Sequence, residues 1–416
     1  MEKINAIKGM NDILPSETYI WSYLEQKIKL WVQSYGYENI RMPIVENTKL
    51  FTRSIGEVTD IVEKEMYTFI DKLNNDSLTL RPEGTAGCIR AVTQNQLLYN
   101  TTQKLWYMGP MFRHERPQKG RYRQFHQLGV EALGFKGPEI DAEIVLMQAQ
   151  LWQILGLKNI QLQINCLGEA DERVKHKQEL IAYFEKYKDL LDEDCLNRLY
   201  KNPLRILDSK NPQLQQLINE APQLINYLGK QSQQHYNGWK QYLQQLGINF
   251  AENSRLVRGL DYYNLSVFEW VSFNLGAQGT ISGGGRYDPL IKQLSGKDNY
   301  AIGFGMGMER LILEIQAQNQ TPNPDYPDVF IANFGEATQA MSFNAAQQLR
   351  DRGYNVIQNL SDGSLKSQLK RANSMNCRIT LIIGETEVLN NQIVVKFMDS
   401  QEQQVINFDE LVNHIK

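Results

Sequence analysis

The chain has 416 residues and a formal net charge of −3, with 42% hydrophobic and 22% charged residues. These proportions are typical of a globular protein of two or three domains. The chain has no apolar run of about 18 residues, and Met1–Met10 contains no long apolar stretch. We therefore expect a cytoplasmic protein with no membrane span. The four cysteines and five histidines lack metal-ligand spacing, which argues against a disulfide scaffold and a protein-only metal site.

Helices and strands alternate in the first part of the chain. Apolar residues at helical spacing predict a helix over 17–35, and a short strand is expected at 40–42. Residues 77–81 have the pattern of a strand that turns at Pro82 into a helix starting at Glu83. A hairpin over 104–134, a helix over 139–155 and a strand over 161–166 are expected to follow.

The composition changes after Gly168 and again near Thr321. The stretch between 169 and 250 is predicted to be helical, and it is rich in Gln, Asn, Lys and Leu. Strand character returns at 264–271 and near Thr280, and residues 321–327 hold three prolines, which is typical of a linker. The expected parts are a core in two pieces, a helical insertion and a small α/β domain: 1–168 with 251–320, 169–250, and 328–416.

The hairpin carries the strongest chemical signal. Residues 104–134 hold six Lys/Arg against two Glu, around a turn that contains Pro117 and Gly120. Alternation along the second strand places a polar row on one face and apolar residues on the other. The polar row is Arg123, Phe125, Gln127, Gly129 and Glu131, and the apolar row is Leu128, Val130 and Ala132. Such a row suits a ligand with phosphates at one end and a hydrogen-bond donor at the other, although a solvated hairpin has a similar composition.

Four other segments combine charge with glycine or aromatic residues. They are Arg81–Thr85, Arg258–Tyr263, Gly283–Asp288 and Gly303–Arg310. Each also has a structural interpretation by itself: a helix start with an acidic first turn, packing around a glycine turn, a hairpin bend, and close helix–strand packing, respectively.

At this order and spacing the segments resemble the histidyl-tRNA synthetases from about Gly9–Asp12 to the C-terminus. Pro43, Phe112–Glu131 and Gly303–Arg310 resemble the three class II motifs. Arg258–Tyr263 and Gly283–Asp288 resemble the two signatures particular to the histidine enzyme. The C-terminal part resembles the family's anticodon-binding domain, but Asn376-Cys377 stands where a Gly-Ala pair is common.

The resemblance implies an α+β fold, in which a mixed, mostly antiparallel sheet is flanked by helices, and a homodimer. The implied reaction activates L-histidine with ATP, accompanied by Mg²⁺, to histidyl-adenylate and pyrophosphate. Histidine then passes to the terminal ribose of tRNA(His). Positioning and cations aimed at the phosphorus are what the first step needs, because the attacking carboxylate is already an anion.

The resemblance also implies the roles of individual residues. Arg113 and Arg258 would be catalytic, holding the α-phosphate from two sides, with Arg258 in place of a metal. Phe125 and Arg310 would sandwich adenine. The implied ATP-binding set is Arg113, Glu115, Arg121, Phe125 and Arg310. The implied histidine-binding set is Glu83, Thr85, Gln127, Glu131, Arg258, Tyr262 and Tyr263.

For the imidazole ring, Glu131 and Tyr263 would meet the two nitrogens. Arg116, Gln118 and Arg123 would approach the tRNA acceptor end, while the insertion clamps the acceptor stem. Two alternatives come from other classes: a regulatory subunit of ATP phosphoribosyltransferase that binds histidine without activating it, and an RNA-binding module with an inactive core. The presence of Arg113, Arg258 and Arg310 and of the C-terminal part favours the enzyme.

Overall fold

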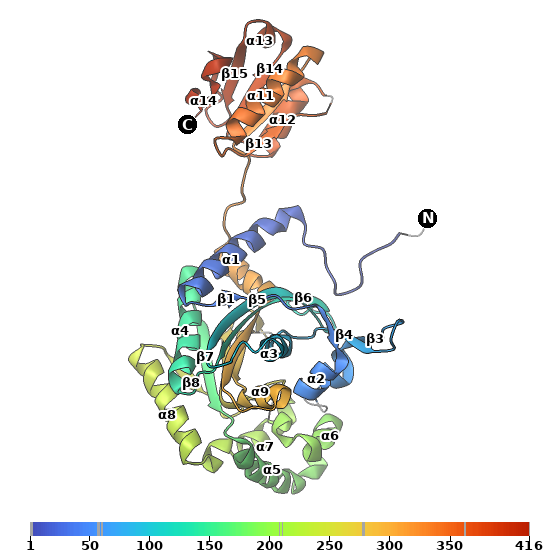
Figure 1. The fold of residues 1–416 in the computed structure, drawn as a ribbon, viewed down its shortest axis with the longest axis vertical. Helices are drawn as coiled ribbons and strands as arrows, with labels where there is room; N and C mark the ends of the chain where they lie inside the picture. The colour runs from blue at the N-terminus through green and yellow to red at the C-terminus, as the bar shows by residue number, and fades with distance from the viewer. Residues whose placement is uncertain are drawn as a thin grey trace. The chain divides into compact units, whose positions relative to one another are not determined.

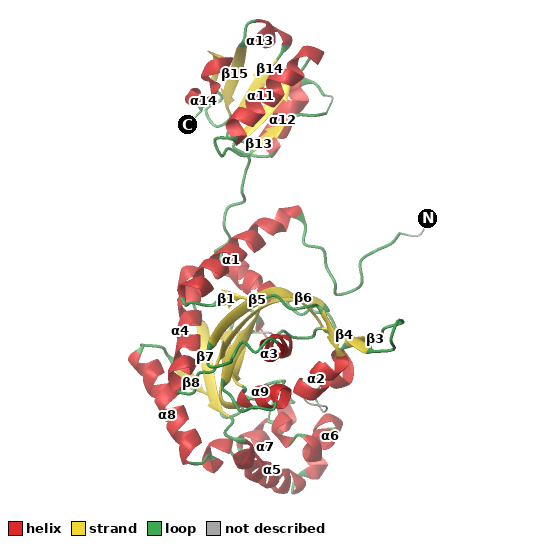
Figure 2. Ribbon diagram, viewed as in Figure 1, coloured by secondary structure: helices red, strands yellow, loops and turns green. Residues whose placement is uncertain are grey.

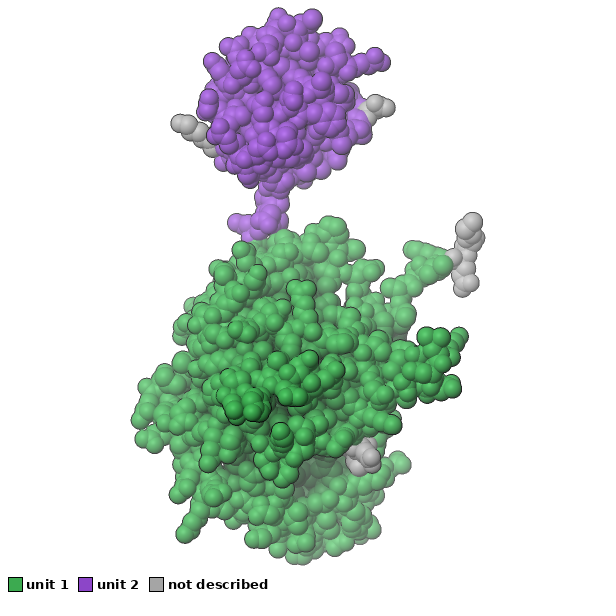
Figure 3. Space-filling model, in the orientation of Figure 1, with its two compact units in different colours: residues 1–322 green, residues 323–416 purple. Residues whose placement is uncertain are grey.

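The computed structural model describes residues 3–55, 59, 61–207, 209, 211–276, 279–361 and 363–415. The chain forms two compact units, residues 1–322 and 323–416, which are described separately (Figure 3). No helix of the described ranges is long and apolar enough to cross a membrane.

A strongly curved sheet organises the first unit (Figures 1 and 2). Within the described residues it has eight strands in the order β1-β5-β6-β11-β10-β9-β7-β8. The inner pairs are antiparallel, and the edge pairs β1–β5 and β7–β8 are parallel. This confirms the predicted mostly antiparallel sheet. The strands are β1 Glu38–Asn39, β5 Gln103–Phe112, β6 Gln124–Leu133, β7 Ile160–Cys166, β8 Phe250–Glu252, β9 Asn264–Ser272, β10 Thr280–Arg286 and β11 Ala301–Gly307.

The strand expected at 40–42 is wrong, because the chain leaves the sheet there. Strand β1 ends at Asn39, and the Ile40 N–H still donates to the Trp106 carbonyl at 2.9 Å. The Met42 carbonyl instead accepts from Arg81 Nη1 at 3.2 Å, and Pro43 has no N–H to offer a ladder.

Helices cover the outer face of the sheet and also fill its concave side. The sheet curves around α3 (Thr85–Gln94) and α9 (Asp288–Ser295) (Figure 1). The apolar row of β6 is fully buried in the main core, together with residues of α1 (Pro15–Ser34), α4 (Pro138–Ile154) and α10 (Met308–Ala317). The polar row of β6 therefore faces the concave side, as its alternation predicts.

Two smaller parts of this unit flank the sheet. Strands β2 (Val45–Asn47), β4 (Ser77–Leu80) and β3 (Tyr67–Ile70) form a separate three-stranded sheet beside α2 (Thr48–Ile55). In the described residues between β7 and β8, the α-helices are α5 Ala170–Glu185, α6 Glu193–Lys201, α7 Gln215–Asn219 and α8 Lys230–Gln245. Helices α5 to α7 share their own apolar cluster, whereas Trp239 of α8 is buried in the main core.

A buried ion pair fastens the end of β10 to α4. Arg286 and Asp141 are both fully buried, with Nη2 and Oδ2 2.8 Å apart. Arg286 Nη2 also donates to the Phe135 and Gly137 carbonyls at 3.1 and 2.8 Å. Burial is the largest effect on Asp141 and raises its pKa, but the charge of Arg286 together with hydrogen bonds from His235 and Ser266 outweighs it, so the pKa lies below its usual value. The pair holds the Gly283–Asp288 segment in place.

We expect Arg286→Met to lower the free energy of unfolding by about 3–5 kcal/mol, because it leaves the Asp141 carboxylate buried without its cation. Urea denaturation of the purified variant measures this. Adding Asp141→Leu to Arg286→Met removes the stranded charge, so the double variant should recover much of the loss. Equal stability of the two variants would contradict this explanation.

The second unit is a small α/β domain. Its described strands form a five-stranded sheet in the order β13-β12-β14-β15-β16, with β12 parallel to both neighbours. The strands are β12 Val329–Asn333, β13 Val356–Gln358, β14 Ile379–Ile383, β15 Gln392–Phe397 and β16 Gln403–Asn407. The helices are α11 Gln339–Arg350, α12 Leu365–Ser374, α13 Glu385–Leu389 and α14 Leu411–His414.

Candidate active site

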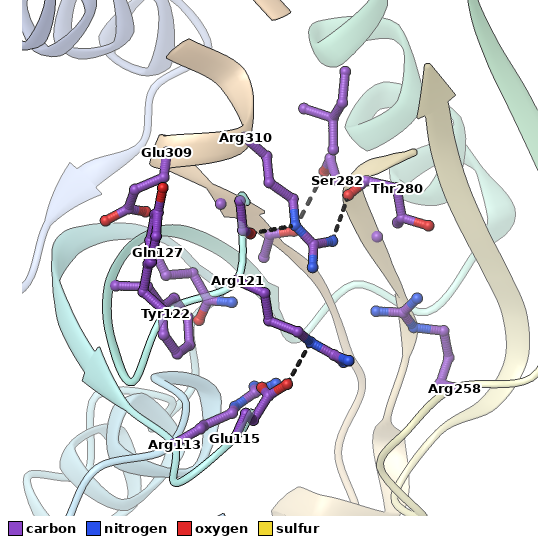
Figure 4. Close-up of a pocket in the computed structure, with 16 residues that line it drawn as sticks. Arg113, Glu115, Arg121, Tyr122, Gln127, Arg258, Thr280, Ser282, Glu309 and Arg310 are labelled. Atoms are coloured by element: carbon purple, nitrogen blue, oxygen red, sulfur yellow. Dashed lines mark hydrogen bonds and ion pairs between the residues drawn. The ribbon is translucent and has the colours of Figure 1, made fainter. Parts of the chain in front are cut away.

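A cavity of about 170 Å³ lies on the concave face of the large sheet (Figure 4). Arg113, Arg258 and Arg310 all line it, although they come from three distant parts of the chain. Its other lining residues come from the β5–β6 loop and from β6, β10, β11 and α10: Glu115, Gly120, Arg121, Tyr122, Phe125, Gln127, Thr280, Ile281, Ser282, Gly283, Gly305, Gly307 and Glu309. The cationic loop and the glycine segments therefore meet in one place.

Glycines on β10 and β11 make room for the polar side chains of the site. A Cβ on Gly303 would lie 1.9 Å from Glu131 Oε2, and one on Gly305 would lie 2.7 Å from Gln127 Nε2. A Cβ on Gly283 would lie 2.7 Å from Arg258 Nη1. The alternating glycines thus leave a bare floor of backbone, over which Glu131, Gln127 and Arg258 extend.

For the reaction that the sequence resemblance implies, we expect Gly303→Ala to lower kcat/KM for histidine by about 10²-fold, because a displacement of about 1 Å at a reacting site can cost that much. Histidine-dependent pyrophosphate exchange measures it. Gly87→Ala is the control, since the new Cβ in buried helix α3 would meet nothing closer than Glu46 Oε1 at 3.6 Å. If both variants behaved alike, the close approach to Glu131 would not matter.

Glu131 is fully buried and is surrounded by hydroxyl groups. Its Oε1 accepts from Thr85 Oγ1 at 2.9 Å and from the Tyr107 hydroxyl at 2.8 Å, and its Oε2 accepts from the Tyr287 hydroxyl. Burial raises the pKa of Glu131 to about 8, although the three hydroxyls oppose the shift. Glu131 is not among the residues lining the cavity; it lies farther along β6, beyond Gln127.

The raised pKa predicts that the stability contributed by Glu131 falls as the pH rises. The folded chain holds this proton up to about pH 8 and the unfolded chain releases it near 4.5, so the folded state binds more protons between these values. This contribution to the free energy of unfolding is on the order of a few kcal/mol. It is complete below about pH 4.5 and is lost by about pH 8. Denaturation of the wild type and Glu131→Gln across this range measures it. A difference between the two that does not change with pH would refute the shift.

Three tyrosines form an aromatic wall next to Glu131. The ring centroids of Tyr262 and Tyr263 are 4.7 Å apart, and those of Tyr262 and Tyr287 are 5.6 Å apart. The Arg258 guanidinium lies 5.8 Å from the centroid of the Tyr263 ring and pairs with Glu269 of β9. Burial lowers the pKa of Arg258, but Glu269 and Tyr263 outweigh this, so the pKa is raised and the group stays charged.

The opposite side of the cavity is cationic. Arg113 donates through Nε to the Pro82 carbonyl at 2.8 Å, and its guanidinium lies 5.3 Å from the centroid of the Phe125 ring. Arg310 donates to the Gly120 and Thr280 carbonyls at 3.1 and 2.8 Å (Figure 4). Burial and then the charge of Arg121 lower the pKa of Arg310. Mutual repulsion of this kind is relieved by a polyanion.

Two further pairings involve acidic residues expected in the site. Arg121 forms an ion pair with Glu115 within the β5–β6 loop (Figure 4). Glu83 accepts the backbone N–H groups of Thr85 and Ala86 at 2.6 and 2.9 Å, so its carboxylate caps the start of α3. Burial raises the pKa of Glu83. A helix does start in this segment, but it begins at Thr85 and has no acidic residue in its first turn, so the expected start at Glu83 and the acidic first turn are wrong. The Glu83 carboxylate precedes the helix and lies beside Thr85, a partner of Glu131.

The residues expected to approach tRNA lie at the tip and base of the β5–β6 loop. Arg116 and Gln118 are exposed, and Gln118 pairs with Arg121 through two backbone hydrogen bonds. Arg123 lies at the base, where its Nε donates to the Glu115 carbonyl at 3.1 Å and its N–H donates to the Gly9 carbonyl at 2.7 Å. The loop tip presents Arg116 and Gln118 to solvent, whereas Arg123 braces the loop.

Three partners of the site residues were missing from the set expected from the sequence. They are Tyr107, Tyr287 and Glu269. Tyr287 stands inside the Gly283–Asp288 segment, which did carry a signal. Tyr107 and Glu269 lie within largely apolar strand sequences, and only the neighbouring strands show that they face the site. Among the described residues, no group of three His, Cys, Asp or Glu is placed to hold a metal ion.

Two family models match the chain. The model described as histidyl-tRNA synthetase matches residues 9–311, and the model described as anticodon binding domain matches residues 328–416.

Relatives match along their full length. A histidine--tRNA ligase of Laribacter hongkongensis is 58% identical over 416 residues, which is 100% of this chain and 98% of that protein. The histidine--tRNA ligase of Dechloromonas aromatica is 53% identical and covers 100% of this chain and 97% of that protein.

Solved structures share the fold. Apo histidyl-tRNA synthetase of S. aureus has a TM-score of 0.83 at 35% identity, covering 99% of this chain and 100% of that one. A Bacillus halodurans protein, described as an ATP phosphoribosyltransferase regulatory subunit/histidyl-tRNA synthetase, has a TM-score of 0.66 at 21% identity, covering 92% and 98%. At that identity it shares the fold alone.

Proposed function

This chain belongs to the histidyl-tRNA synthetase family, and we propose that its arginine-lined cavity and the adjoining Glu131 slot form one active site. The protein is an aminoacyl-tRNA synthetase. It activates histidine with ATP to histidyl-adenylate and pyrophosphate, and it then transfers histidine to the 3′-terminal ribose of its tRNA. The observation that carries the site assignment is that Arg113, Arg258 and Arg310 line a single cavity.

In the first step a histidine carboxylate oxygen attacks the α-phosphorus of ATP, and the bond from that phosphorus to the β-phosphate oxygen breaks. Arg113 and Arg258 hold the α-phosphate from opposite sides and neutralise charge that builds up on it. Planar guanidinium groups suit this work because they donate in a fixed fork. When ATP binds, Arg121 leaves its ion pair with Glu115 and contacts the outer phosphates, which Arg310 also binds.

Adenine stacks on Phe125. The ring lies in the cavity wall with Arg113 above it, so the Arg113 guanidinium turns toward the α-phosphate as the base enters. Arg310 covers the other face of adenine from α10. Mg²⁺ arrives with ATP and is held mainly by the phosphates. The nearby carboxylates Glu115 and Glu269 already face arginines, and they fit the ion only as secondary ligands.

Histidine lies along the polar row of β6, with its ring at Glu131 and its carboxylate at Arg258. Residues 127 and 131 are roughly 13 Å apart along the strand. Gln127, Glu83 and Thr85 therefore receive the α-ammonium, while Glu131 and Tyr263 meet the two ring nitrogens. Tyr262 supports Tyr263 by ring contact. The histidine N–H replaces one of the hydroxyls that now satisfy Glu131.

The tRNA acceptor end approaches the exposed loop tip at Arg116 and Gln118, with Arg123 fixing the loop from below. The second unit, residues 323–416, carries the part that matches the anticodon-binding model. It contacts the anticodon through unstacked bases rather than through gross charge, since residues 325–416 hold eight Lys/Arg against eleven Asp/Glu.

We propose a cytoplasmic homodimer. Large apolar side chains are exposed on the N-terminal segment and on the three-stranded sheet; Ile4, Ile7, Phe69, Ile70 and Leu73 are 96, 62, 45, 57 and 96% exposed, respectively. Burying such side chains between two copies is favourable. Light scattering of the purified protein should give twice the 48.1 kDa chain mass; a value at the chain mass would refute the dimer.

A regulatory subunit that binds histidine without activating it is the competing function. It needs no phosphate-binding arginines, yet three arginines line this cavity, and full-length ligases are more than 50% identical to this chain. Pyrophosphate exchange with each amino acid in turn separates the two. Exchange with histidine alone supports the enzyme, and binding of histidine without exchange would overturn the proposal.

A further inference from the structure

The turn that carries Tyr263 into β9 is backbone-strained and is held from the insertion side. Leu265, two residues after Tyr263, has φ +45°, a conformation that L-residues other than glycine adopt at a cost. Its N–H donates to the Gly168 carbonyl at 3.1 Å, and its carbonyl accepts from the Leu167 N–H at 2.7 Å. Such a conformation persists only where the surroundings fix it, and here they are the residues that lead into α5.

Two side chains at the start of α5 contact this turn: Glu169 accepts from Asn264 Nδ2 at 3.4 Å, and the second is Arg173. Its Nη1 donates to the Tyr263 carbonyl. Farther along the insertion, Arg205 Nη1 lies 3.4 Å from the Arg258 carbonyl, and Asn202 Nδ2 donates to Asp261 Oδ1 at 3.2 Å. The insertion therefore contacts the Arg258–Tyr263 segment near both ends, and two of the contacts are to backbone carbonyls of that segment.

A second cavity lies beside the contact between Arg173 and Tyr263. It has a volume of about 360 Å³ and lies between the insertion and the signature segment; its lining includes Arg173, Lys177 and Arg205 on one side and Arg258 and Tyr263 on the other. Arg258 also lines the ATP cavity, so the segment forms a thin wall between two hollows. The Tyr262 and Tyr263 rings pack in the main core, whereas on the side of the second cavity hydrogen bonds from the insertion hold the backbone of the segment.

From these contacts we infer that Arg173 is a positioning residue for histidine recognition, which acts by fixing the Tyr263 backbone and thereby the Tyr263 hydroxyl opposite Glu131. The inference rests on the proposed histidine slot. The helical insertion then contributes to the selection of histidine, because a displacement of α5 moves the tyrosine wall against which the imidazole ring packs. By reciprocity, bound histidine stiffens the seam between the insertion and the core.

The test compares Arg173→Met, Arg173→Lys and Lys175→Met by pyrophosphate exchange and thermal denaturation. Methionine keeps the aliphatic stem but donates no hydrogen bond, and lysine restores one donor without the planar fork. Lys175 is an exposed residue of the same helix that does not line the second cavity. We expect Arg173→Met to raise the KM for histidine about 10-fold or more, since small misplacements at a site are costly, while the KM for ATP stays within about 2-fold. Arg173→Lys should fall between this variant and the wild type, and Lys175→Met should match the wild type.

Other outcomes decide against the inference. A lower melting temperature with unchanged KM values, or an equal rise in both KM values, would make Arg173 merely structural. If Arg173→Met does not fold, the Arg173→Lys variant decides by itself. A wild-type KM for histidine in that variant would overturn the inference. These failures differ from failure of the proposed function, in which the wild type itself shows no histidine-dependent exchange.

Discussion

Glu131→Ala should lower kcat/KM for histidine by about 10³-fold or more, because a site built to hydrogen-bond a ring nitrogen discriminates by factors of this order. Three hydroxyls converge on this carboxylate, and without it they have no common acceptor to orient them around the ring. The arginine-lined cavity proposed to bind ATP does not include Glu131, so the KM for ATP should change little. Pyrophosphate exchange at varied histidine and varied ATP measures both.

A matched control is available on α10. Glu314 is also fully buried and hydrogen-bonded, to Ser272 at 2.7 Å and Asn274 at 2.8 Å. Glu314→Ala removes a buried carboxylate elsewhere, so it should lower stability and leave the KM for histidine unchanged. Unchanged exchange in Glu131→Ala would refute the histidine slot, whereas equal effects of both substitutions would trace the loss to general destabilisation.

The second large effect is expected for Arg258→Met, which should lower kcat of adenylate formation by about 10²- to 10³-fold, the usual loss when one group that stabilises transition-state charge is removed. This variant also leaves Glu269, the partner of Arg258 behind the cavity lining, without its cation. The stranded carboxylate repels the phosphates, so the KM for ATP should rise as well. Single-turnover pyrophosphate release measures the chemical step directly.

The double variant Arg258→Met/Glu269→Gln separates these two effects. Removing the carboxylate should restore the KM for ATP, but it cannot restore kcat, because the cation is still missing. Arg258→Lys keeps the charge without the fork and should lose less than methionine does. An Arg258→Met variant with wild-type kcat would show that this arginine does not touch the reacting phosphate.

Local patterns predicted a large part of the fold. Alternation along β6 gave the correct faces, because a strand buried on one side must separate its apolar row from its polar row. Glycine-rich β10 and β11 were recognised as unusual, yet their purpose is visible only when β11 lies against β6, with Gly303 opposite Glu131. Strands that are neighbours in this sheet, such as β6 and β11, are far apart in the sequence, so local patterns do not show which strands pair.

The side-chain partners were the part that sequence did not provide. Glu269 interrupts an apolar run in β9, and nothing local shows that Arg258, eleven residues earlier, turns back to pair with it. Tyr107 stands among Leu105, Trp106 and Met108, where an aromatic residue is normally core. Its hydroxyl reaches Glu131 because two glycines yield the space its ring occupies: a Cβ on Gly84 or Gly129 would lie 2.1 Å from ring atoms of Tyr107.

The hydroxyl partners of Glu131 also set an order of events during translation. Tyr107 and Thr85 precede it by 24 and 46 residues, whereas Tyr287 follows by 156. Because chains emerge from the ribosome N-terminus first, the Glu131 carboxylate lacks its third hydroxyl partner while the whole of α5 to α8 is being synthesised. We infer that the proposed histidine slot is complete only after Tyr287, which follows β10, has been made.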